Sequence, residues 1–374
     1  MSYNLLDLNR NGLPKLTDGL ENAESWHDRR KEIERVWLDE IGGVPDRVPV
    51  SYEVLDEAKE ADHTRIRLVY DTVYGDKVSA FLLLPDESVG GAGADGRRPG
   101  LLALHPTHES GKADVAVPNG RANRGYGVEL VSRGYVVLAP DALTAGERIY
   151  PGLQSFRSMP FYERHPDWST VGKNAIDHIQ GVDLLRSLDG VDADRIGAIG
   201  HSFGGYNAYF LAGLDSRIRA YVSSCGFSPF YGDRQPTHWG ERDWYTHLPR
   251  ISGHLSRYEV PFEFHEIAAL AAPVPAFHYY GQNDRIFPHW QAVGACMAEL
   301  DELYRFLGAG DRFQAYMTAG GHDFPPEIRG LAYAFLDRWL KGPSGQDEGA
   351  ERHPAESILT KSPGSATLIT NITE

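Results

Sequence analysis

The stretch "DRIGAIGHSFGGYNAYFLAG", residues 194–213, decides how the chain folds. An apolar run leads into Gly-His-Ser-Phe-Gly-Gly and then into a small, apolar segment of helical length, which predicts a strand, a sharp turn and a helix. A serine at such a turn exposes its hydroxyl at the sheet edge, and the positions two before and two after it must be small. These positions are Gly200 and Gly204, and this G-x-S-x-G pattern occurs once in the chain. Ser202 is therefore the candidate nucleophile.

The segments around this stretch predict an α/β fold. The short apolar runs "LLALH", "YVVLAP", "RIGAIGH", "RAYVSSC" and "PVPAFHYYG" are separated by segments of helical length, notably 171–188, 203–214 and 289–306. Buried strands separated by helices indicate a mostly parallel central sheet with helices on both faces. Such sheets bind their ligands at the carboxyl ends of the strands, so we look for functional residues there.

The rest of the chain suggests four parts. Residues 1–47 form a helical extension, in which Trp26, Arg30, Ile33, Trp37 and Ile41 recur at helical spacing. The α/β domain spans 48–340 and begins with antiparallel strands over 48–84. Within it, residues 226–262 are rich in aromatic residues and proline and read as a lid-like insertion, although a local core is the alternative. Residues 341–374 contain no Phe, Trp or Tyr and predict a flexible tail.

A serine hydroxyl is a weak nucleophile unless a base takes its proton and an acid orients that base. Asp284 follows the apolar run of "PVPAFHYYGQNDRIFP", and His322 lies in the Gly-flanked loop of "RFQAYMTAGGHDFP". The order serine, acid, histidine along the chain is the one that α/β-hydrolases use, so these residues predict a catalytic triad with Ser202. A turn-forming Asp284 and a surface His322 are the structural alternatives, and Asp233, one strand earlier, stays open as the acid.

The negative charge that develops on the substrate oxygen needs two backbone N–H donors. One is expected from Phe203, the residue after the nucleophile. The other is expected from the loop "PTHESGK" that follows "LLALH". Because Pro106 has no N–H, Thr107 is the better candidate.

The same loop also suggests a metal site as an alternative. His105, His108 and Glu109 are residue types that bind zinc, but no further carboxylate or cysteine supports them. We therefore expect no metal and no organic cofactor.

Four residues are candidates for substrate binding. Trp239 and Trp244 lie in the predicted lid and would line the pocket if the insertion overhangs Ser202. Arg121 and Arg124 lie in "AVPNGRANRGYG", a loop from the strand ends, where an arginine fork suits a substrate carboxylate. Solvated surface arginines are the alternative.

Composition limits the classes of partner and location. The net charge of −15 argues against a general nucleic-acid surface. No apolar run approaches the ~18 residues of a membrane span, and the first residues do not resemble a signal peptide. Cys225 and Cys296 stand in apolar contexts and predict buried free thiols, with one disulfide as the alternative, so we expect a cytoplasmic protein. The oligomeric state is not indicated.

Several of these segments together resemble a known family. "LALHPTHESGK", "GYVVLAPDALTAGER", "GVDLLRSLDGVDADRIGAIGHSFGG", "PFEFHEIAALAAPVPAF", "GQNDRIFP" and "GGHDFP" resemble bacterial α/β-hydrolases of the dienelactone-hydrolase-like and acetyl-xylan-esterase-like group, over roughly residues 25–340. The resemblance implies a serine esterase whose triad maps onto Ser202, Asp284 and His322, and whose oxyanion donors map onto Thr107 and Phe203. It departs from the family in two places. Dienelactone hydrolases proper have a cysteine where this chain has Ser202, and many relatives have His-Gly where it has "HP" at 105–106.

The expected function is hydrolysis of a carboxylic ester through an acyl-serine intermediate. The expected substrate is a small-molecule ester with an acetyl or other small acyl group. Sugar-linked esters and esters that bear a carboxylate belong to this expected class. A ligand-binding protein or a lyase on the same scaffold is the alternative from another class. A peptidase and a lactonase are the alternatives within hydrolysis.

Overall fold

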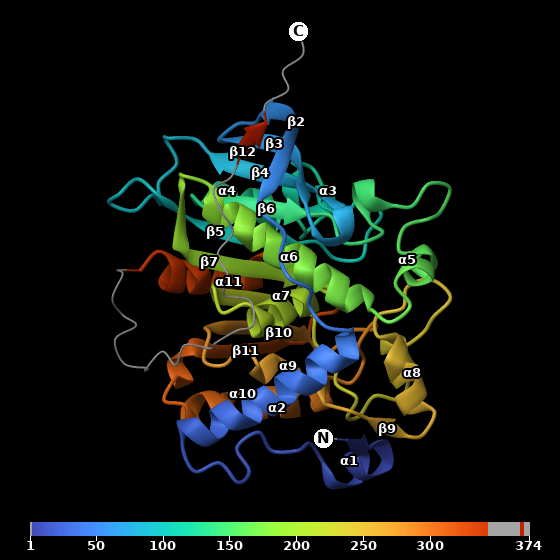
Figure 1. The fold of residues 1–374 in the computed structure, drawn as a ribbon. Coiled ribbons are helices and arrows are strands. Elements are labelled where there is room, and N and C mark those ends of the chain that lie inside the picture. Colours follow the sequence, from blue (N-terminus) through green and yellow to red (C-terminus); the bar gives the residue numbers. More distant parts are fainter. Residues whose placement is uncertain (1, 343–366, 370–374) are drawn as a thin grey trace.

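A ten-stranded sheet forms the centre of the protein (Figure 1). The computed structural model describes residues 2–342 and 367–369. In spatial order the strands are β11 (Phe313–Thr318), β10 (Ala276–Gly281), β8 (Ile218–Ser224), β7 (Val191–His201), β5 (Arg98–Leu104), β6 (Val136–Pro140), β4 (Lys77–Pro85), β3 (His63–Asp71), β2 (Ser51–Lys59) and β12 (Thr367–Ile369).

The direction of the strands confirms the predicted fold class. The six strands from β11 to β6 run parallel to their neighbours. The N-terminal strands β2, β3 and β4 are antiparallel to one another, and β4 joins the parallel part through an antiparallel pairing with β6. Because β5, β7, β8 and β10 run parallel, they end at the same edge of the sheet. The candidate residues that follow these strands are therefore brought together at that edge.

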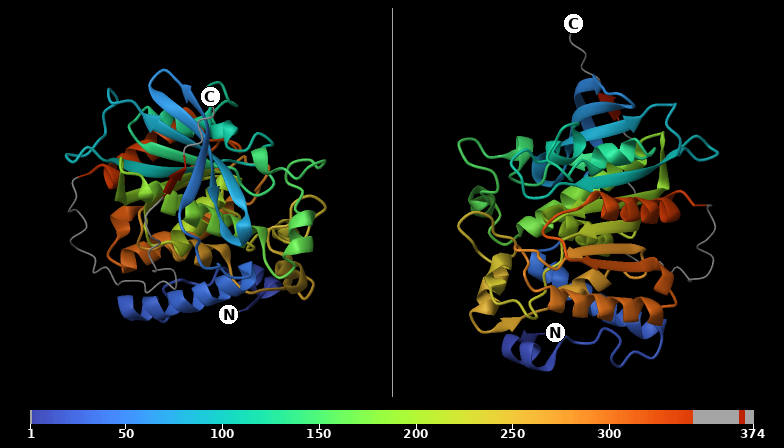
Figure 2. Two further views of the ribbon diagram at one scale, coloured as in Figure 1. Left: turned by 45° about the horizontal axis from the view of Figure 1, so that its top comes forward. Right: turned by 180° about the vertical axis from the view of Figure 1, so that it is seen from behind.

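Helices cover both faces of the sheet (Figures 1 and 2). Alternate side chains of one strand belong to different cores: Ala80 and Leu82 of β4 face one core, and Phe81 and Leu83 face the other. The first core is covered by α2 (Ala23–Ile41), α6 (Thr170–Ser187), α7 (Phe203–Leu214), α9 (Phe264–Ala269) and α10 (Trp290–Phe306), and the second by α3 (Ala113–Ala116), α4 (Tyr126–Val131) and α11 (Pro326–Leu340).

The N-terminal extension packs directly on the first core. Trp37 of α2 is fully buried, and its ring lies 4.8 Å from that of Phe210 and 5.3 Å from that of Phe262. Arg30, on the same side of the helix, donates to the carbonyl oxygens of Leu270 and Gly213. The predicted amphipathic helix is therefore present. The short helix α1 (Leu5–Asn11) precedes it.

Residues 226–262 pack into the protein and carry their own short elements. These are a 3₁₀ turn η3 (Pro236–Trp239), α8 (Pro249–Leu255) and β9 (Glu259–Val260), and β9 pairs antiparallel with β1 (Tyr3–Asn4). Phe227, Phe230, Trp239 and Tyr245 are at most 2% exposed. These aromatic side chains thus form a local core, the alternative that the sequence left open.

Four further short helical segments complete the described chain. Three are 3₁₀ turns, η1 (Val73–Gly75), η2 (Gly146–Arg148) and η4 (Gly310–Arg312), and the fourth is α5 (Met159–Arg164), which precedes α6. The tail expected over 341–374 lies outside the described residues except for 341–342 and β12, which pairs in parallel with β2 at the sheet edge. Within the described ranges, none of the helices is both long and apolar enough to cross a membrane. Cys225 and Cys296 are free and buried, which confirms that expectation.

Candidate active site

Ser202 lies at the sharp turn between β7 and α7. Its backbone has φ 55° and ψ −117°, a strained conformation for a residue other than glycine. A Cβ on Gly204 would lie 1.9 Å from the carbonyl oxygen of Leu104, and one on Gly200 would lie 2.1 Å from that of Gly204. The small residues on either side of the serine are therefore required by the close approach of β5 and α7.

Ser202, His322 and Asp284 form one hydrogen-bonded chain. The Ser202 hydroxyl donates to Nε2 of His322 over 2.7 Å, and Nδ1 of the same ring donates to Oδ2 of Asp284 over 2.6 Å. The three side chains come from the ends of β7 and β10 and from the loop between β11 and α11. The structure thus brings together the three residues that the sequence singled out.

The surroundings of this chain fix the orientation of its acid. Asp284 is 2% exposed, and its other oxygen, Oδ1, accepts the N–H groups of Ile286 (2.8 Å) and Phe287 (3.0 Å). The ring of Phe287 packs against that of His322, with centroids 5.8 Å apart. Both carboxylate oxygens have defined partners, so the carboxylate is held in one orientation.

Asp233, the alternative acid, lies in a different cluster. Its carboxylate faces the rings of His238 (3.2 Å) and His289 (3.9 Å). His322 is instead bound to Asp284. The geometry therefore favours Asp284 as the partner of the histidine.

The two expected oxyanion donors are backbone N–H groups of Phe203, directly after Ser202, and of Thr107, in the loop after β5. Neither the N–H of Phe203 nor that of Thr107 has a hydrogen-bond partner within residues 2–342 and 367–369. His105 holds the loop that carries Thr107, because its Nδ1 donates to the carbonyl oxygen of Pro106 (2.8 Å) and its Nε2 accepts the N–H of Ala142 (2.9 Å). Both N–H groups are thus available to an incoming oxygen atom.

These hydrogen bonds also bear on metal binding. Both ring nitrogens of His105 and Nδ1 of His108 already have hydrogen-bond partners, the last one being the Ser110 hydroxyl (2.7 Å). These three nitrogens are therefore not available to a metal ion. Ligand atoms of Cys225, Asp284 and His322 also lie within 4.8 Å of one another. Burial raises the pKa of the Cys225 thiol to about 12. A protonated thiol is a poor metal ligand, and this group fits proton transfer better than metal binding.

The two arginines expected to bind substrate are paired with carboxylates. Arg121 makes two hydrogen bonds of 2.7 Å to Asp114, which is 2% exposed. Arg124 binds Oδ1 of Asp323, the residue after His322, over 2.7 Å. Burial by itself would raise the pKa of the Asp323 carboxyl. The hydrogen bond from Arg124 helps to hold this pKa below its usual range instead. Arg121 therefore has its fork occupied, and Arg124 anchors the histidine loop.

The two tryptophans of the 226–262 segment have different environments. Trp239 is 1% exposed, its ring centroid lies 4.2 Å from that of Phe264, and its indole N–H donates to the carbonyl oxygen of Ser228 (3.2 Å). Trp244 is 37% exposed, and the guanidinium of Arg242 lies 4.6 Å above its ring. Trp239 is part of the core, and only Trp244 remains available to a substrate.

Sequence reasoning missed two neighbours of the site. Phe156 has φ 58°, and its ring contacts those of Phe203 (5.5 Å) and Trp244 (6.2 Å), linking the nucleophile turn to the 226–262 segment. The imidazole of His201 lies 4.9 Å from that of His322 and is bonded to the Ser224 hydroxyl. Burial lowers the pKa of His201 well below its ordinary value, so the ring is neutral beside His322. No periodicity pointed to Phe156, whereas the position of His201 next to Ser202 was a usable signal.

Comparisons with known proteins place the chain among hydrolases. The profile of the prolyl oligopeptidase family matches residues 155–343. YtaP of Bacillus subtilis (strain 168), whose name assigns it provisionally to the hydrolases, is 28% identical over 317 residues, which are 84% of this chain and 99% of YtaP.

Solved structures show the same fold. A glucuronoyl esterase from Solibacter usitatus has a TM-score of 0.64 at 20% identity, covering 85% of this chain and 94% of the esterase. Acetyl xylan esterase 1 from Thermoanaerobacterium sp. JW/SL YS485 has a TM-score of 0.52 at 17% identity, covering 83% and 93%. The fold is that of the α/β-hydrolases.

Proposed function

The chain belongs to the prolyl oligopeptidase family, and from this premise we propose that it is a serine hydrolase that cleaves a carboxylic ester through an acyl-serine intermediate. The observation that carries the proposal is the hydrogen-bonded chain from the Ser202 hydroxyl through His322 to Asp284. It has the connectivity that transfers a proton from a nucleophile to a base held by an acid.

The first half of the reaction acylates the serine. Ser202 Oγ attacks the carbonyl carbon of the ester while Nε2 of His322 takes its proton. Asp284 holds the opposite nitrogen protonated, so that Nε2 is free to accept, and stabilises the imidazolium that forms. The carbonyl oxygen becomes an oxyanion, which the N–H groups of Phe203 and Thr107 bind.

The second half returns the enzyme to its starting state. His322 gives its proton to the departing alkoxide, which leaves as the alcohol. A water molecule then attacks the acyl carbon, His322 accepts the proton of that water, and the carboxylic acid is released as Ser202 Oγ regains a proton from His322.

The substrate class follows from the walls of the site and from the relatives. Solved structures with this fold bear the names of glucuronoyl and acetyl xylan esterases, which favours a small or sugar-linked ester. Phe156 packs on Phe203 at the nucleophile turn, and Trp244, which contacts Phe156 and is 37% exposed, supplies apolar surface. Because Arg121 and Arg124 already pair with carboxylates, an uncharged ester is favoured over an anionic one.

The free thiols of Cys225 and Cys296 support a cytoplasmic location.

Three measurements test the proposal. A fluorophosphonate probe should label the wild type and not Ser202→Ala, and 4-nitrophenyl acetate turnover should fall by ~10³-fold or more in that variant. Labelling of Ser202→Ala at the wild-type rate would place the nucleophile elsewhere. A folded wild type that the probe does not label would favour a binding protein or a lyase. The family match also fits a peptidase, so turnover of a dipeptidyl 4-nitroanilide faster than of the ester would overturn ester cleavage as the main activity.

A further inference from the structure

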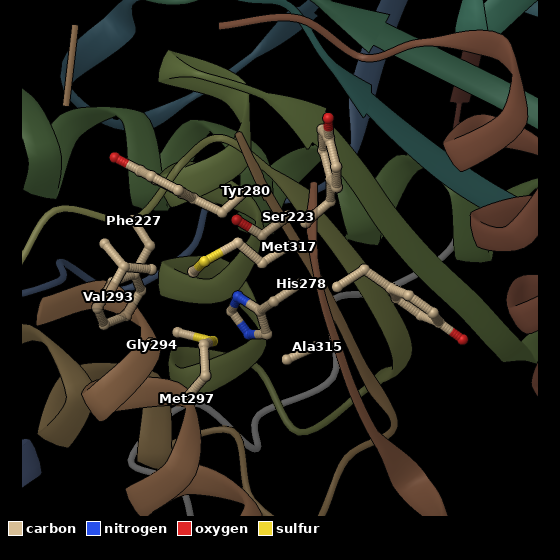
Figure 3. Close-up of a pocket in the computed structure, with 11 residues that line it drawn as sticks. Ser223, Phe227, His278, Tyr280, Val293, Gly294, Met297, Ala315 and Met317 are labelled. Atoms are coloured by element: carbon tan, nitrogen blue, oxygen red, sulfur yellow. The ribbon is translucent and has the colours of Figure 1, made fainter. Parts of the chain in front are cut away.

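A cavity of about 210 Å³ lies between α10 and the edge of the sheet formed by β8, β10 and β11 (Figure 3). Ser202, Asp284 and His322 are not among the described residues that line it. The reaction proposed above therefore leaves this cavity unused.

The strand register builds the floor of the cavity. Ser223 of β8 is the direct partner of His278 of β10, and His278 is the direct partner of Ala315 of β11, so the three side chains lie on the same face. Ser223 and His278 are 1% and 4% exposed. Ala315 is exposed and Gly294 of α10 is half-buried, so the cavity opens between α10 and the edge strand.

Two polar groups of this floor lack partners. The Ser223 hydroxyl is buried and has no hydrogen-bond partner in the described part of the chain. Nε2 of His278 is held by the Tyr221 hydroxyl (2.9 Å), and Nδ1 of the same ring has no partner among the described residues. A buried hydroxyl without a partner costs stability, and a ligand that accepts its hydrogen bond would remove that cost.

The rest of the lining is apolar. Val293 and Met297 of α10, Met317 of β11 and Phe227 surround the two polar groups (Figure 3). None of the lining residues carries a full charge, because burial lowers the pKa of His278 to about 3 and keeps its ring neutral. Such a lining excludes ions, while thioether sulfurs favour contact with an aromatic ring.

The volume sets the size of the ligand. An engineered apolar cavity of about 150 Å³ holds one benzene molecule. The space under α10 is somewhat larger and therefore accommodates one ring with a small substituent.

We propose that this cavity is a second ligand site, which binds an uncharged, single-ring molecule. A hydroxyl group of the ligand forms hydrogen bonds with Ser223 and His278. The Ser223 hydroxyl donates to the ligand oxygen, and the ring of His278 is the second partner. The site is separate from the proposed ester cleavage and stands independently of it.

Phenol and toluene are matched probes, because they share their size and differ in the hydroxyl. Phenol should bind the wild-type protein saturably in calorimetric or NMR titrations, and toluene more weakly. Ser223→Ala should weaken phenol binding by roughly 2- to 10-fold and leave toluene within about twofold, as expected for one neutral hydrogen bond.

Filling the cavity tests its location. Gly294→Leu places a side chain inside the cavity and should abolish binding of both probes, while Gly330→Leu, at an exposed glycine of α11 with open space around it, should leave both unchanged. Circular dichroism melting shows whether Gly294→Leu folds. If it does not, Gly294→Ala replaces it, because its Cβ would make only an ordinary contact, 3.8 Å from Met317 Cε, and binding should fall severalfold. Wild-type affinity for phenol in the filled variant, or no saturable phenol binding to the wild type, would overturn the proposal.

Discussion

Replacement of Asp284 by asparagine should disable the base without disturbing the fold. Oδ1 of Asp284 accepts two backbone N–H groups, from Ile286 and Phe287, and Oδ2 accepts Nδ1–H of His322. In Asp284→Asn, the amide oxygen must stay with the two backbone donors, so the NH₂ group faces His322. Nδ1 then becomes the acceptor and the proton moves to Nε2. The histidine would point an N–H at Ser202 and could no longer take its proton.

The expected loss is large because the wrong tautomer blocks the first chemical step. An equivalent exchange in a serine protease lowers kcat by roughly 10⁴-fold, which corresponds to about 5.4 kcal/mol of transition-state stabilisation. Stability should change little, because both backbone donors keep an acceptor.

The assay is steady-state turnover of 4-nitrophenyl acetate together with the rate of fluorophosphonate labelling. Asp233→Asn is the matched control: Asp233 lies against His238 and His289, so its exchange should leave kcat unchanged. A loss of only ~10-fold or less in a folded Asp284→Asn variant would refute the argument from the tautomer. A large loss in Asp233→Asn would refute the choice of acid.

Three further predictions concern stability and substrate. Trp239→Ala should lower the free energy of unfolding by about 3–5 kcal/mol in urea titrations without changing KM, whereas Trp244→Ala should raise KM severalfold and change stability by less than ~1 kcal/mol. Arg121→Ala leaves the buried carboxylate of Asp114 without its partner and should cost about 1–3 kcal/mol, while the kcat/KM ratio of a carboxylate-bearing ester to its neutral analogue should not move. Burial raises the pKa of Glu40 from 4.5 to about 7, so the folded state keeps a proton that the unfolded chain loses. Stability should therefore fall as pH rises from about 4.5 to 7, by as much as ~3 kcal/mol, and Glu40→Gln should flatten that slope.

The parallel part of the fold was readable from the sequence because its signals are local. The helices expected at 171–188, 203–214 and 289–306 are found at Thr170–Ser187, Phe203–Leu214 and Trp290–Phe306. Ser202, Asp284 and His322 each follow a predicted strand, and parallel strands of one sheet must end at the same edge. Their convergence could thus be expected without knowing any distance.

Side-chain partners could not be read in the same way. Arg121 looked available for a substrate because its partner, Asp114, carries no mark of burial in the sequence. Trp239 looked like part of a lid because Phe264, one of the rings that pack on it, lies beyond the insertion. Pairings of this kind depend on packing between segments, and spacing along the chain does not report it.

The pairing of β1 with β9 has a consequence for the order in which the molecule is assembled. Tyr3 is the partner of Val260, and the N–H of Leu5 donates to the carbonyl oxygen of Tyr258. During synthesis, β1 therefore emerges from the ribosome long before β9 and cannot pair with it until the whole chain between the two strands has emerged. Because contacts so distant along the chain form late and slowly, the segment that holds Trp239 and Trp244 should gain its final support only after the strand of the nucleophile has formed.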